Sequence, residues 1–497
     1  MKKTNDLLML ATNPTSDFFR ELWPLFAAGT TLLITIVASV HAILTKRETS
    51  AAVGWVGIIW LVPFIGALIY LTLGVNRIRR RAKSRRSDVP HVEIPEPAPV
   101  RSLGAIAERL PPEGKHLTAL AKVINKVTTQ KLIPGNSLKP LVNGDEAYPE
   151  MLKAIQSART SISLTTYIFA NDPTGREFCD ALARAVKRGV EVRILIDAVG
   201  LRYSFPSILR YLRGSGIRVA RFMPSAVPWR MPYMNLRTHR KILTVDGKVS
   251  FTGGMNIAQG NRLLESPRHP IQDLHFRVEG PVVRELQECF VDDWAFSTRE
   301  ILTKDIWFPP LGEVGPVIAR GITDGPDENF DRLRLSILGA IASARKSIRI
   351  TTPYFLPDQS IISAINTAAM RDVAVDIILP LHNNLRFVNW ASMAQVWQML
   401  RWGARIWQSP PPFDHTKLMI VDDHWLLLGS ANWDPRSLFL NFEFNVECYD
   451  HTLAHSLVNL FERKRERSHL LTLEEVRARS FPIKLRDGIA RLLSPYL

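Results

Sequence analysis

The chain has 497 residues, enough for roughly two or three domains. Its formal charge of +16 and pI near 9.9 indicate an anionic partner, either nucleic acid or an acidic membrane surface. The three cysteines lie far apart, a spacing that shows neither a disulfide framework nor a zinc site and that fits a reducing compartment.

Two apolar stretches follow the short N-terminal segment 1–24, which carries no cleavable signal pattern. Residues 25–44 are apolar except for His41, and residues 51–73 are uncharged throughout. Each stretch is long enough to cross a bilayer, and the short connection between them allows only a tight turn. We therefore predict a transmembrane hairpin over residues 25–74. The alternative is a pair of helices buried in a soluble protein.

A basic cluster directly follows the second stretch, because residues 76–86 hold seven Lys and Arg. By the positive-inside rule this end is cytoplasmic, and an even number of spans returns the N-terminus to the same side. Lys46 and Arg47 in the connection argue against this orientation but are outnumbered. We expect the cluster to contact anionic head groups as well. The cluster, the Pro-rich linker 87–113 and a polar helical stretch that we expect to about Lys131 make up the segment 75–140.

From residue 141 the chain alternates amphipathic helices with apolar strands, and the same order occurs twice. The expected helices are 148–159, 176–188, 330–345 and 359–371, and the expected strands are 161–169, 190–197, 347–355 and 373–380. Such alternation predicts an α/β fold with helices covering the sheets. The duplication predicts two similar αβα sandwich halves, 141–318 and 319–475, related by pseudo-two-fold symmetry across one active site.

A His-x-Lys motif occurs once in each half, with five residues at identical spacing. These are His239, Lys241, Asp246, Gly253 and Asn256 in the first copy, and His415, Lys417, Asp422, Gly429 and Asn432 in the second. Five matches at fixed offsets should arise by chance on the order of once per several million start positions. The two copies are therefore a duplicated site and not a coincidence.

The spacing has a chemical reason. His and Lys two apart on a strand point to the same face, so each imidazole has an ammonium group beside it. This arrangement suits an anionic substrate better than a metal ion. The Asp-Gly pair at 246–247 indicates a hairpin turn, and glycine at the end of the return strand lets a ligand approach. A single His on a strand is usually structural, but the duplication favours a functional site.

In duplicate, H-x-K-x4-D-x6-G-x2-N resembles the signature of the phospholipase D superfamily, over roughly residues 140–450. The resemblance implies a phosphohistidine intermediate, with no metal and no cofactor. The second copy carries the Gly-Ser pair usual in that family, whereas the first has Gly254 in place of the serine. The hairpin, the basic cluster and residues 53–81 and 494–497 further resemble bacterial cardiolipin synthases of this type. That resemblance implies that two phosphatidylglycerol molecules give cardiolipin and glycerol.

This chemistry assigns roles to the motif residues. One imidazole attacks phosphorus while the other, protonated, donates to the departing glycerol oxygen. The resemblance makes His239 the nucleophile and His415 the acid and base. We expect four residues to bind the phosphate oxygens, namely Lys241, Lys417, Asn256 and Asn432. Asp246 and Asp422 belong to the catalytic motif of the family but sit at turns, beyond reach of the substrate, so we expect them to be structural.

Two carboxylates outside the motifs are candidates for orienting the histidines. Asp273 and Glu443 lie in alternating, strand-like runs at corresponding places after Asn256 and Asn432. A histidine that alternates between roles needs its second ring nitrogen held, and a buried carboxylate can do this. The alternative is that each is an exposed carboxylate on a strand.

Two further segments suggest contact with lipid. Residues 222–234, rich in Pro, Met and aromatic residues, are a candidate for a membrane-dipping loop. The C-terminal segment 476–497 has an apolar stripe beside basic residues, so it lies on the membrane surface or packs against the catalytic halves. A second aromatic stripe, at 390–400, has helical spacing and indicates core.

The predicted setting is the bacterial inner membrane, with multi-pass topology and cytoplasmic catalytic halves. The predicted partners are phosphatidylglycerol and other anionic phospholipids, not nucleic acid. A hydrolytic phospholipase D, or a transferase that uses another alcohol, would carry the same motifs. A nuclease would explain the basicity but not the two spans, and a non-enzymatic lipid anchor would be expected to lose a His or Lys. The sequence leaves open the acceptor, the acyl preference, the regulation and the oligomeric state, a homo-oligomer included. Because the two motifs are alike, it also leaves open which histidine is the nucleophile.

Overall fold

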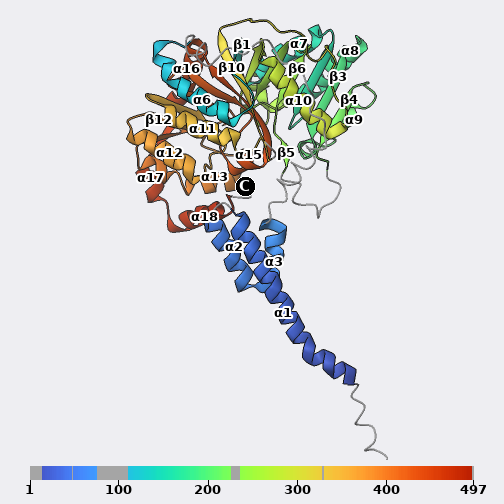
Figure 1. The fold of residues 1–497 in the computed structure, drawn as a ribbon. Coiled ribbons are helices and arrows are strands. Elements are labelled where there is room, and N and C mark those ends of the chain that lie inside the picture. The colour runs from blue at the N-terminus through green and yellow to red at the C-terminus, as the bar shows by residue number, and fades with distance from the viewer. Residues whose placement is uncertain (1–13, 47–48, 75–109, 225–235, 327–328, 495–497) are drawn as a thin grey trace, which may run out of the picture. The chain divides into compact units, whose positions relative to one another are not determined.

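A computed structural model gives the fold and describes residues 14–46, 49–74, 110–224, 236–326 and 329–494. The chain divides into two compact units, Met1–Arg81 and Ala82–Leu497 (Figure 1). The predicted basic cluster 76–86 lies outside the described residues, as does most of the predicted membrane-dipping stretch before His239.

The N-terminal unit is helical. It contains α1 (Pro14–Thr45), α2 (Thr49–Leu61), α3 (Pro63–Ile69) and a π-helical turn, η1 (Tyr70–Gly74). Among the described residues one helix is long and apolar enough to cross a membrane, over Leu22–Thr45. The predicted second span is interrupted before Pro63, because proline lacks an N–H and its ring crowds the preceding helical turn. The apolar helix left there, Ala51–Leu61, is shorter, so the second span stays a prediction.

The larger unit is built on a mixed sheet, which confirms the predicted α/β class. Among the described residues, the sheet has sixteen strands in the order β18-β13-β12-β11-β15-β16-β17-β10-β1-β9-β7-β6-β2-β3-β4, with β5 pairing with β17. The strands of the first half are β1 (Ile133–Val142), β2 (Ser161–Thr166), β3 (Glu191–Asp197), β4 (Arg218–Phe222), β5 (Arg237–Thr238), β6 (Ile242–Val245), β7 (Val249–Gly253) and β9 (Leu274–Glu279). Those of the second half are β10 (Val317–Asp324), β11 (Ser347–Thr351), β12 (Ala374–Pro380), β13 (Arg405–Ser409), β15 (Leu418–Val421), β16 (Trp425–Gly429), β17 (Asn441–Tyr449) and β18 (His469–Leu471).

The strand order is the same from the middle outwards in both directions. β1 pairs antiparallel with β10 at the centre, then β9, β7 and β6 follow on one side and β17, β16 and β15 on the other. The outer strands are parallel in each half, β2-β3-β4 and β11-β12-β13. Each outer group is one of the repeated helix–strand runs in the sequence, and each motif lies on an adjacent antiparallel hairpin.

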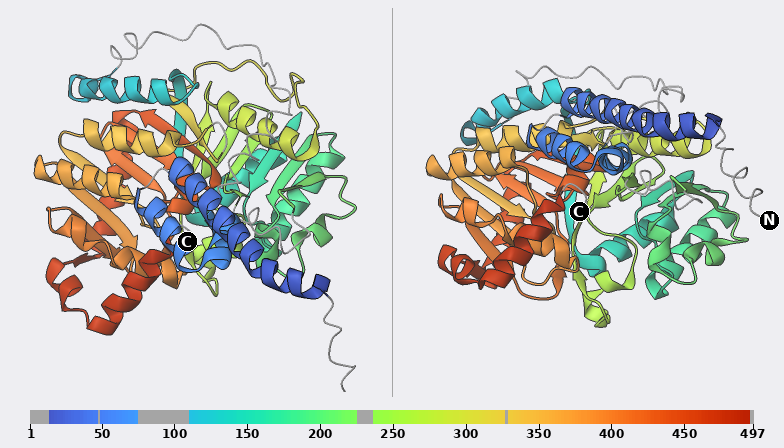
Figure 2. Two further views of the ribbon diagram at one scale, coloured as in Figure 1. Left: turned by 60° about the horizontal axis from the view of Figure 1, so that its bottom comes forward. Right: turned by 90° about the horizontal axis from the view of Figure 1, so that it is seen from below.

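Helices cover both faces of this sheet (Figures 1 and 2). On one face, α7 (Asn143–Ser157) and α8 (Pro173–Lys187) bury apolar side chains against the first half. On the second half, α11 (Arg332–Ser343) and α12 (Gln359–Met370) do the same. A third core, under α10 (Val283–Thr298) and α16 (His451–Glu466), contains side chains of both halves. This shared core fixes the two halves against each other.

Part of the predicted linker is structured. The 3₁₀ turn η2 (Pro112–Leu117) and helix α6 (Thr118–Val127) precede β1 and pack on α11. Leu117, Leu120 and Ile124 recur at helical spacing and are fully buried in the core of the second half. Burial of this apolar stripe explains why the segment forms a helix here.

The C-terminal segment ends in α18 (Phe481–Leu492), which packs against α13 (Arg386–Met393). Its inner face buries Asp487 and Ala490. The helix also exposes five large apolar side chains, namely Phe481 (74% exposed), Ile483 (38%), Leu485 (50%), Ile489 (54%) and Leu492 (78%). The segment therefore packs on the catalytic unit and still presents an apolar face.

Candidate active site

Each motif histidine is attached through its backbone to a strand of the other half. β5 runs parallel to the start of β17, and the His239 N–H donates to the Phe442 carbonyl at 2.9 Å. In the same way β14 (Phe413–Asp414) pairs with β8 (Ile271–Gln272), and the His415 N–H donates to the Gln272 carbonyl at 2.7 Å. These two crossed pairings carry both histidines to the junction between the halves.

The predicted carboxylates hold the histidines in a crossed arrangement. Nδ1 of His239 lies 3.0 Å from both carboxylate oxygens of Glu443, which belongs to the other half and is fully buried. Ser430 Oγ donates to Glu443 Oε2 at 2.5 Å, and Asn441 Nδ2 donates to Oε1 at 3.2 Å. Burial would raise the pKa of Glu443, but His239 and Lys241 together with these hydrogen bonds lower it to about 2.

The second pair is built differently. Nδ1 of His415 lies 2.8 Å from Asp273 Oδ2, and Asp273 Oδ1 accepts the Leu274 N–H at 2.8 Å. Burial opposes ionisation of Asp273, but the charges of Lys417 and His415 lower its pKa. Gly254 lies directly against this carboxylate, at the place where the second half has Ser430. The two histidines therefore have acidic partners of different length and different surroundings.

Burial sets the charge of both imidazoles. It lowers the pKa of His239 to about 4 and outweighs the attraction of Glu443, which acts in the opposite direction. It also lowers the pKa of His415 to about 4, with Lys417 adding to the effect and Asp273 opposing it. Both rings are therefore neutral near pH 7. Since a carboxylate can only accept, Nδ1 carries the proton in each ring and Nε2 keeps its lone pair. In His415 this lone pair faces Lys417 Nζ, which lies 3.0 Å from Nε2.

The two motif lysines adopt matching positions. Lys241 Nζ donates to the His239 carbonyl at 2.6 Å, and Lys417 Nζ donates to the His415 carbonyl at 2.5 Å. Burial lowers the pKa of Lys241 to about 7, against the pull of Glu443, and that of Lys417 to about 8, against the pull of Asp273. Such poorly solvated ammonium groups gain from an anion between them, because it replaces the lost hydration.

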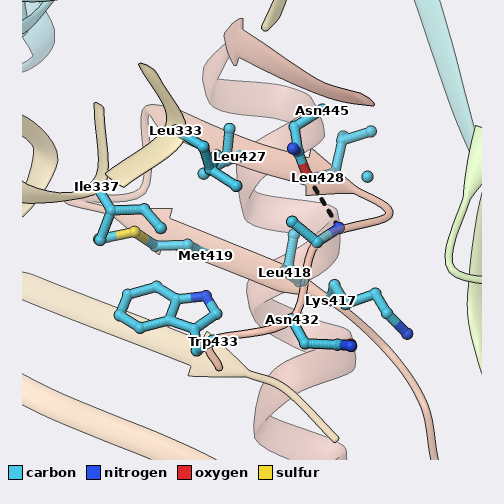
Figure 3. Close-up of a pocket in the computed structure, with 12 residues that line it drawn as sticks. Leu333, Ile337, Lys417, Leu418, Met419, Leu427, Leu428, Asn432, Trp433 and Asn445 are labelled. Carbon is cyan, nitrogen blue, oxygen red and sulfur yellow. Dashed lines mark hydrogen bonds between the residues drawn. The ribbon is translucent and has the colours of Figure 1, made fainter. Parts of the chain in front are cut away.

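The motif asparagines differ in their contacts. Asn256 Oδ1 accepts the Ile168 N–H at 3.0 Å. Asn432 Oδ1 is buried and makes no hydrogen bond within the described residues. Figure 3 shows the side-chain nitrogens of Asn432 and Lys417 pointing to the same side of a small pocket. Apolar side chains close the pocket behind them, including Ile337, Met419 and Trp433.

The motif aspartates accept hydrogen bonds from backbone amides and do not contact the motif histidines. Asp246 accepts the N–H groups of Arg159, Thr160 and Ser161, at the start of β2. Asp422 accepts the corresponding groups of residues 345–347 at the start of β11, and His116 also contacts its carboxylate. We interpret both as structural, because each connects a motif hairpin to the neighbouring strand. Among the described residues, no group of His, Cys, Asp and Glu could hold a metal ion.

A tyrosine that belongs to neither motif lies beside each histidine. The ring centroids of Tyr167 and His239 are 5.5 Å apart, and those of Tyr354 and His415 are 6.2 Å apart. The signal for both was present, because Thr-Thr-Tyr at 165–167 returns as Thr-Thr-Pro-Tyr at 351–354. A search for short motifs that recur near the ends of strands would therefore have identified both tyrosines.

Comparisons with known proteins agree with this geometry. Residues 151–294 and 337–465 match the family model described as "Cardiolipin synthase, PLD-like domain", and residues 33–74 match "Phospholipase_D-nuclease N-terminal". The chain is 31% identical to the major cardiolipin synthase ClsA of Bacillus subtilis, over 91% of this chain and 95% of that one. It is 32% identical to cardiolipin synthase 1 of Staphylococcus epidermidis, over 91% of this chain and 93% of that one. The solved phosphatidylserine synthase of Haemophilus influenzae shares the fold, with a TM-score of 0.58 and 14% identity over 76% of this chain and all of that one.

Proposed function

Because this chain belongs to the family of phospholipase D-like cardiolipin synthases, we propose that it joins two phosphatidylglycerol molecules into cardiolipin and releases glycerol. It is a phospholipid phosphatidyltransferase. One observation carries the proposal: two buried, neutral histidines are each held through Nδ1 by an ionised carboxylate from the opposite half. A paired site of this kind can form a bond to phosphorus and move a proton in one step.

In the first step, Nε2 of His239 attacks the phosphorus of the donor lipid, and the bond from phosphorus to the glycerol oxygen breaks. His415 gives its proton to that oxygen, so glycerol leaves neutral. The bound phosphodiester carries a negative charge, which raises the pKa of His415 and allows it to be protonated for this task. Lys241, Lys417 and the motif asparagines offset the charge on the non-bridging oxygens.

In the second step, neutral His415 takes a proton from a hydroxyl group of the second phosphatidylglycerol. The resulting oxygen attacks phosphorus, and the bond to His239 breaks. Cardiolipin is formed, and both histidines return to their starting state. Each half supplies one histidine and one lysine to this exchange, which agrees with the matching strand order on either side of β1 and β10. We therefore assign the halves a pseudo-two-fold relation.

Two related functions remain as alternatives, hydrolysis and transfer to another alcohol. Product analysis of the purified protein separates them. With phosphatidylglycerol alone, mass spectrometry should detect cardiolipin and free glycerol. Phosphatidic acid as the only product would indicate a hydrolase, and no cardiolipin without an added alcohol would indicate another acceptor.

Treatment with EDTA should leave the rate of cardiolipin formation within about twofold, because charge is offset by lysine and asparagine and not by a metal. The control is a second sample that receives EDTA followed by excess Mg²⁺. A large loss of rate that only a divalent ion restores would contradict the mechanism.

For the N-terminal unit we propose a membrane hairpin in the bacterial inner membrane, formed by α1 and the apolar helices α2 and α3. Small side chains support close helix packing, because Ala38, Ala42 and Ala67 lie buried between these helices. The seven basic residues at 76–86 then assign the catalytic halves to the cytoplasm. We propose that the net positive charge of the chain promotes binding to anionic lipid and not to nucleic acid.

The orientation predicts a labelling result in intact cells. A Ser87→Cys variant, in a background without the three native cysteines, should resist an impermeant thiol reagent until the cells are lysed. The matched control places the cysteine at Ser50, at the start of α2 and next to the turn between the two proposed spans, where the same reagent should react before lysis. Reaction at position 87 in intact cells would refute the cytoplasmic placement.

A further inference from the structure

A guanidinium group lies beside the first histidine without a full partner. Arg237 is 3% exposed, and its Nη1 makes no hydrogen bond within the described residues. Its nearest carboxylate is Asp197, with Nη1 3.8 Å from Oδ1. That distance makes an ion pair but is too long for a hydrogen bond, so among the described residues the buried Nη1 has a charge partner and no hydrogen-bond acceptor.

Asp197 is already engaged elsewhere. Its Oδ1 accepts the Val199 N–H at 2.8 Å and the Gly200 N–H at 3.3 Å, and its Oδ2 accepts the Thr238 N–H at 3.0 Å. Burial raises the pKa of Asp197 to about 6 in spite of Arg237 and these donors. The Asp197 carboxylate therefore accepts hydrogen bonds from backbone N–H groups and neutralises the charge of the Arg237 guanidinium only in part.

The side chain lies on the side of the chain that carries the catalytic pair. Alternation puts Arg237, His239 and Lys241 together, and Tyr167 is their common neighbour. The Tyr167 ring lies 5.5 Å from the His239 ring and 5.8 Å from Lys241 Nζ, and it interacts electrostatically with Arg237. Arg240 points the other way, where its Nη1 lies 2.5 Å from Asp293 Oδ1 in α10.

More positive charge gathers at the same place. Arg436, from α15 (Pro435–Phe439), and Arg202, from the 3₁₀ turn η3 (Gly200–Tyr203), both act on Arg237 electrostatically. Two guanidinium groups from two other elements thus repel the guanidinium of Arg237. A cluster of positive charges in a folded protein creates a positive potential, which favours binding of an anion.

The second half has no such feature at the corresponding place. The residue two before His415 is Phe413, whose ring lies 6.0 Å from the His415 ring and 6.2 Å from the Tyr354 ring. The next residue, Asp414, is paired with Lys464 at 2.6 Å. The duplicated site is therefore asymmetric, with an arginine two residues before one histidine and a phenylalanine two residues before the other.

We propose that Arg237, with Arg436 beside it, binds the phosphate of the second phospholipid, and so selects an anionic acceptor. This inference rests on the proposed function. Transfer between two phosphatidylglycerol molecules brings two phosphates into one site, and the motif lysines and asparagines surround only the reacting one. A guanidinium fork matches the second phosphate in geometry and charge. A neutral alcohol acceptor has no such phosphate and does not need Arg237.

The test compares two acceptors in one preparation of the full-length protein. Micelles of phosphatidylglycerol are supplied alone, or with excess ethanol, and cardiolipin and phosphatidylethanol are measured by mass spectrometry. Arg237→Gln should lower cardiolipin formation on the order of 10- to 100-fold, the usual size of a lost charged hydrogen bond. Phosphatidylethanol formation should stay within about threefold, which also shows that the variant is folded and reacts with the donor.

Arg237→Lys keeps the charge without the fork and should recover part of the cardiolipin rate. The matched control is Arg193→Gln, another buried arginine of the first half, which is fully paired with Glu191 and Glu300. It should leave the ratio of the two products unchanged. An equal loss of both products in Arg237→Gln, or no loss of either, would overturn the inference. A wild-type protein that makes no cardiolipin would instead refute the proposed function.

Discussion

Replacing Glu443 with glutamine should lower turnover on the order of a hundredfold or more, and Asp273→Asn should have a similar effect. In each case the isosteric amide loses the negative charge that fixes the histidine tautomer and stabilises the imidazolium. Glutamine can also present its NH2 group to Nδ1, which favours the tautomer with its lone pair in the wrong place. Cardiolipin formation per folded molecule is the quantity to measure.

Glu447→Gln is a matched control for Glu443→Gln. Glu447 lies on the same strand, is equally buried, and binds Arg320 and Trp425 instead of a histidine. Its loss should lower the thermal unfolding temperature but leave the turnover of the folded fraction nearly normal. If folded Glu443→Gln also keeps near-normal turnover, Glu443 has no part in the mechanism.

A pH profile separates an orienting role from a merely structural one. Glu443 raises the pKa of His239, against the larger effect of burial. Without its charge the pKa of His239 falls further, so the ring is protonated only at lower pH. Because the nucleophile must be unprotonated, the acidic limb of kcat/KM should move to lower pH in Glu443→Gln. A defect in folding alone would leave that limb in place.

The sequence contains enough to predict the components of this site but not their pairing. Periodicity and the repeated motif lead to His239, His415 and the two downstream carboxylates. Nothing local says that His239 pairs with Glu443, 204 residues away, and not with Asp273 in its own half. That choice depends on how the halves face each other, which the shared core under α10 and α16 decides. Such a core consists of many weak contacts between residues far apart in the chain, so no short motif in the sequence reveals it.

Arg237 and Pro63 show two other limits of prediction from sequence. An arginine near a catalytic histidine has no special pattern, and its significance appears only when its neighbours are known to leave Nη1 without a partner. Hydropathy describes residues 51–73 as one continuous span in which Pro63 is tolerated, although this proline removes a backbone donor. The structure therefore divides that stretch into α2 and α3.

Gly254→Ser is the second substitution with a large expected effect, on the order of a hundredfold loss of turnover. A Cβ atom on Gly254 would lie 2.3 Å from Asp273 Oδ1 and 2.8 Å from Oδ2. Contacts this short cannot be relieved in place, so the carboxylate must leave its position 2.8 Å from His415 Nδ1. The variant should fold, because the clash is with one side chain and not with the backbone.

The second half shows why the family serine is absent here. Ser430 occupies the corresponding position, and its hydroxyl donates to Glu443 at 2.5 Å. Glutamate is one methylene longer than aspartate, so serine with glutamate and glycine with aspartate are two complete solutions. A serine at position 254 would meet the shorter aspartate, whose carboxylate lies where the serine Cβ would be. Asp273→Glu should therefore recover activity when it is added to Gly254→Ser.

The cycle of Gly254→Ser, Asp273→Glu and the double variant tests this directly. Turnover of the double variant should exceed that of Gly254→Ser by about tenfold or more. Ser430→Ala is the control, because it removes one hydrogen bond without a clash and should cost only about tenfold. Near-normal turnover of Gly254→Ser would show that Asp273 can move without harm, and a double variant no better than Gly254→Ser would show that the two positions are not matched.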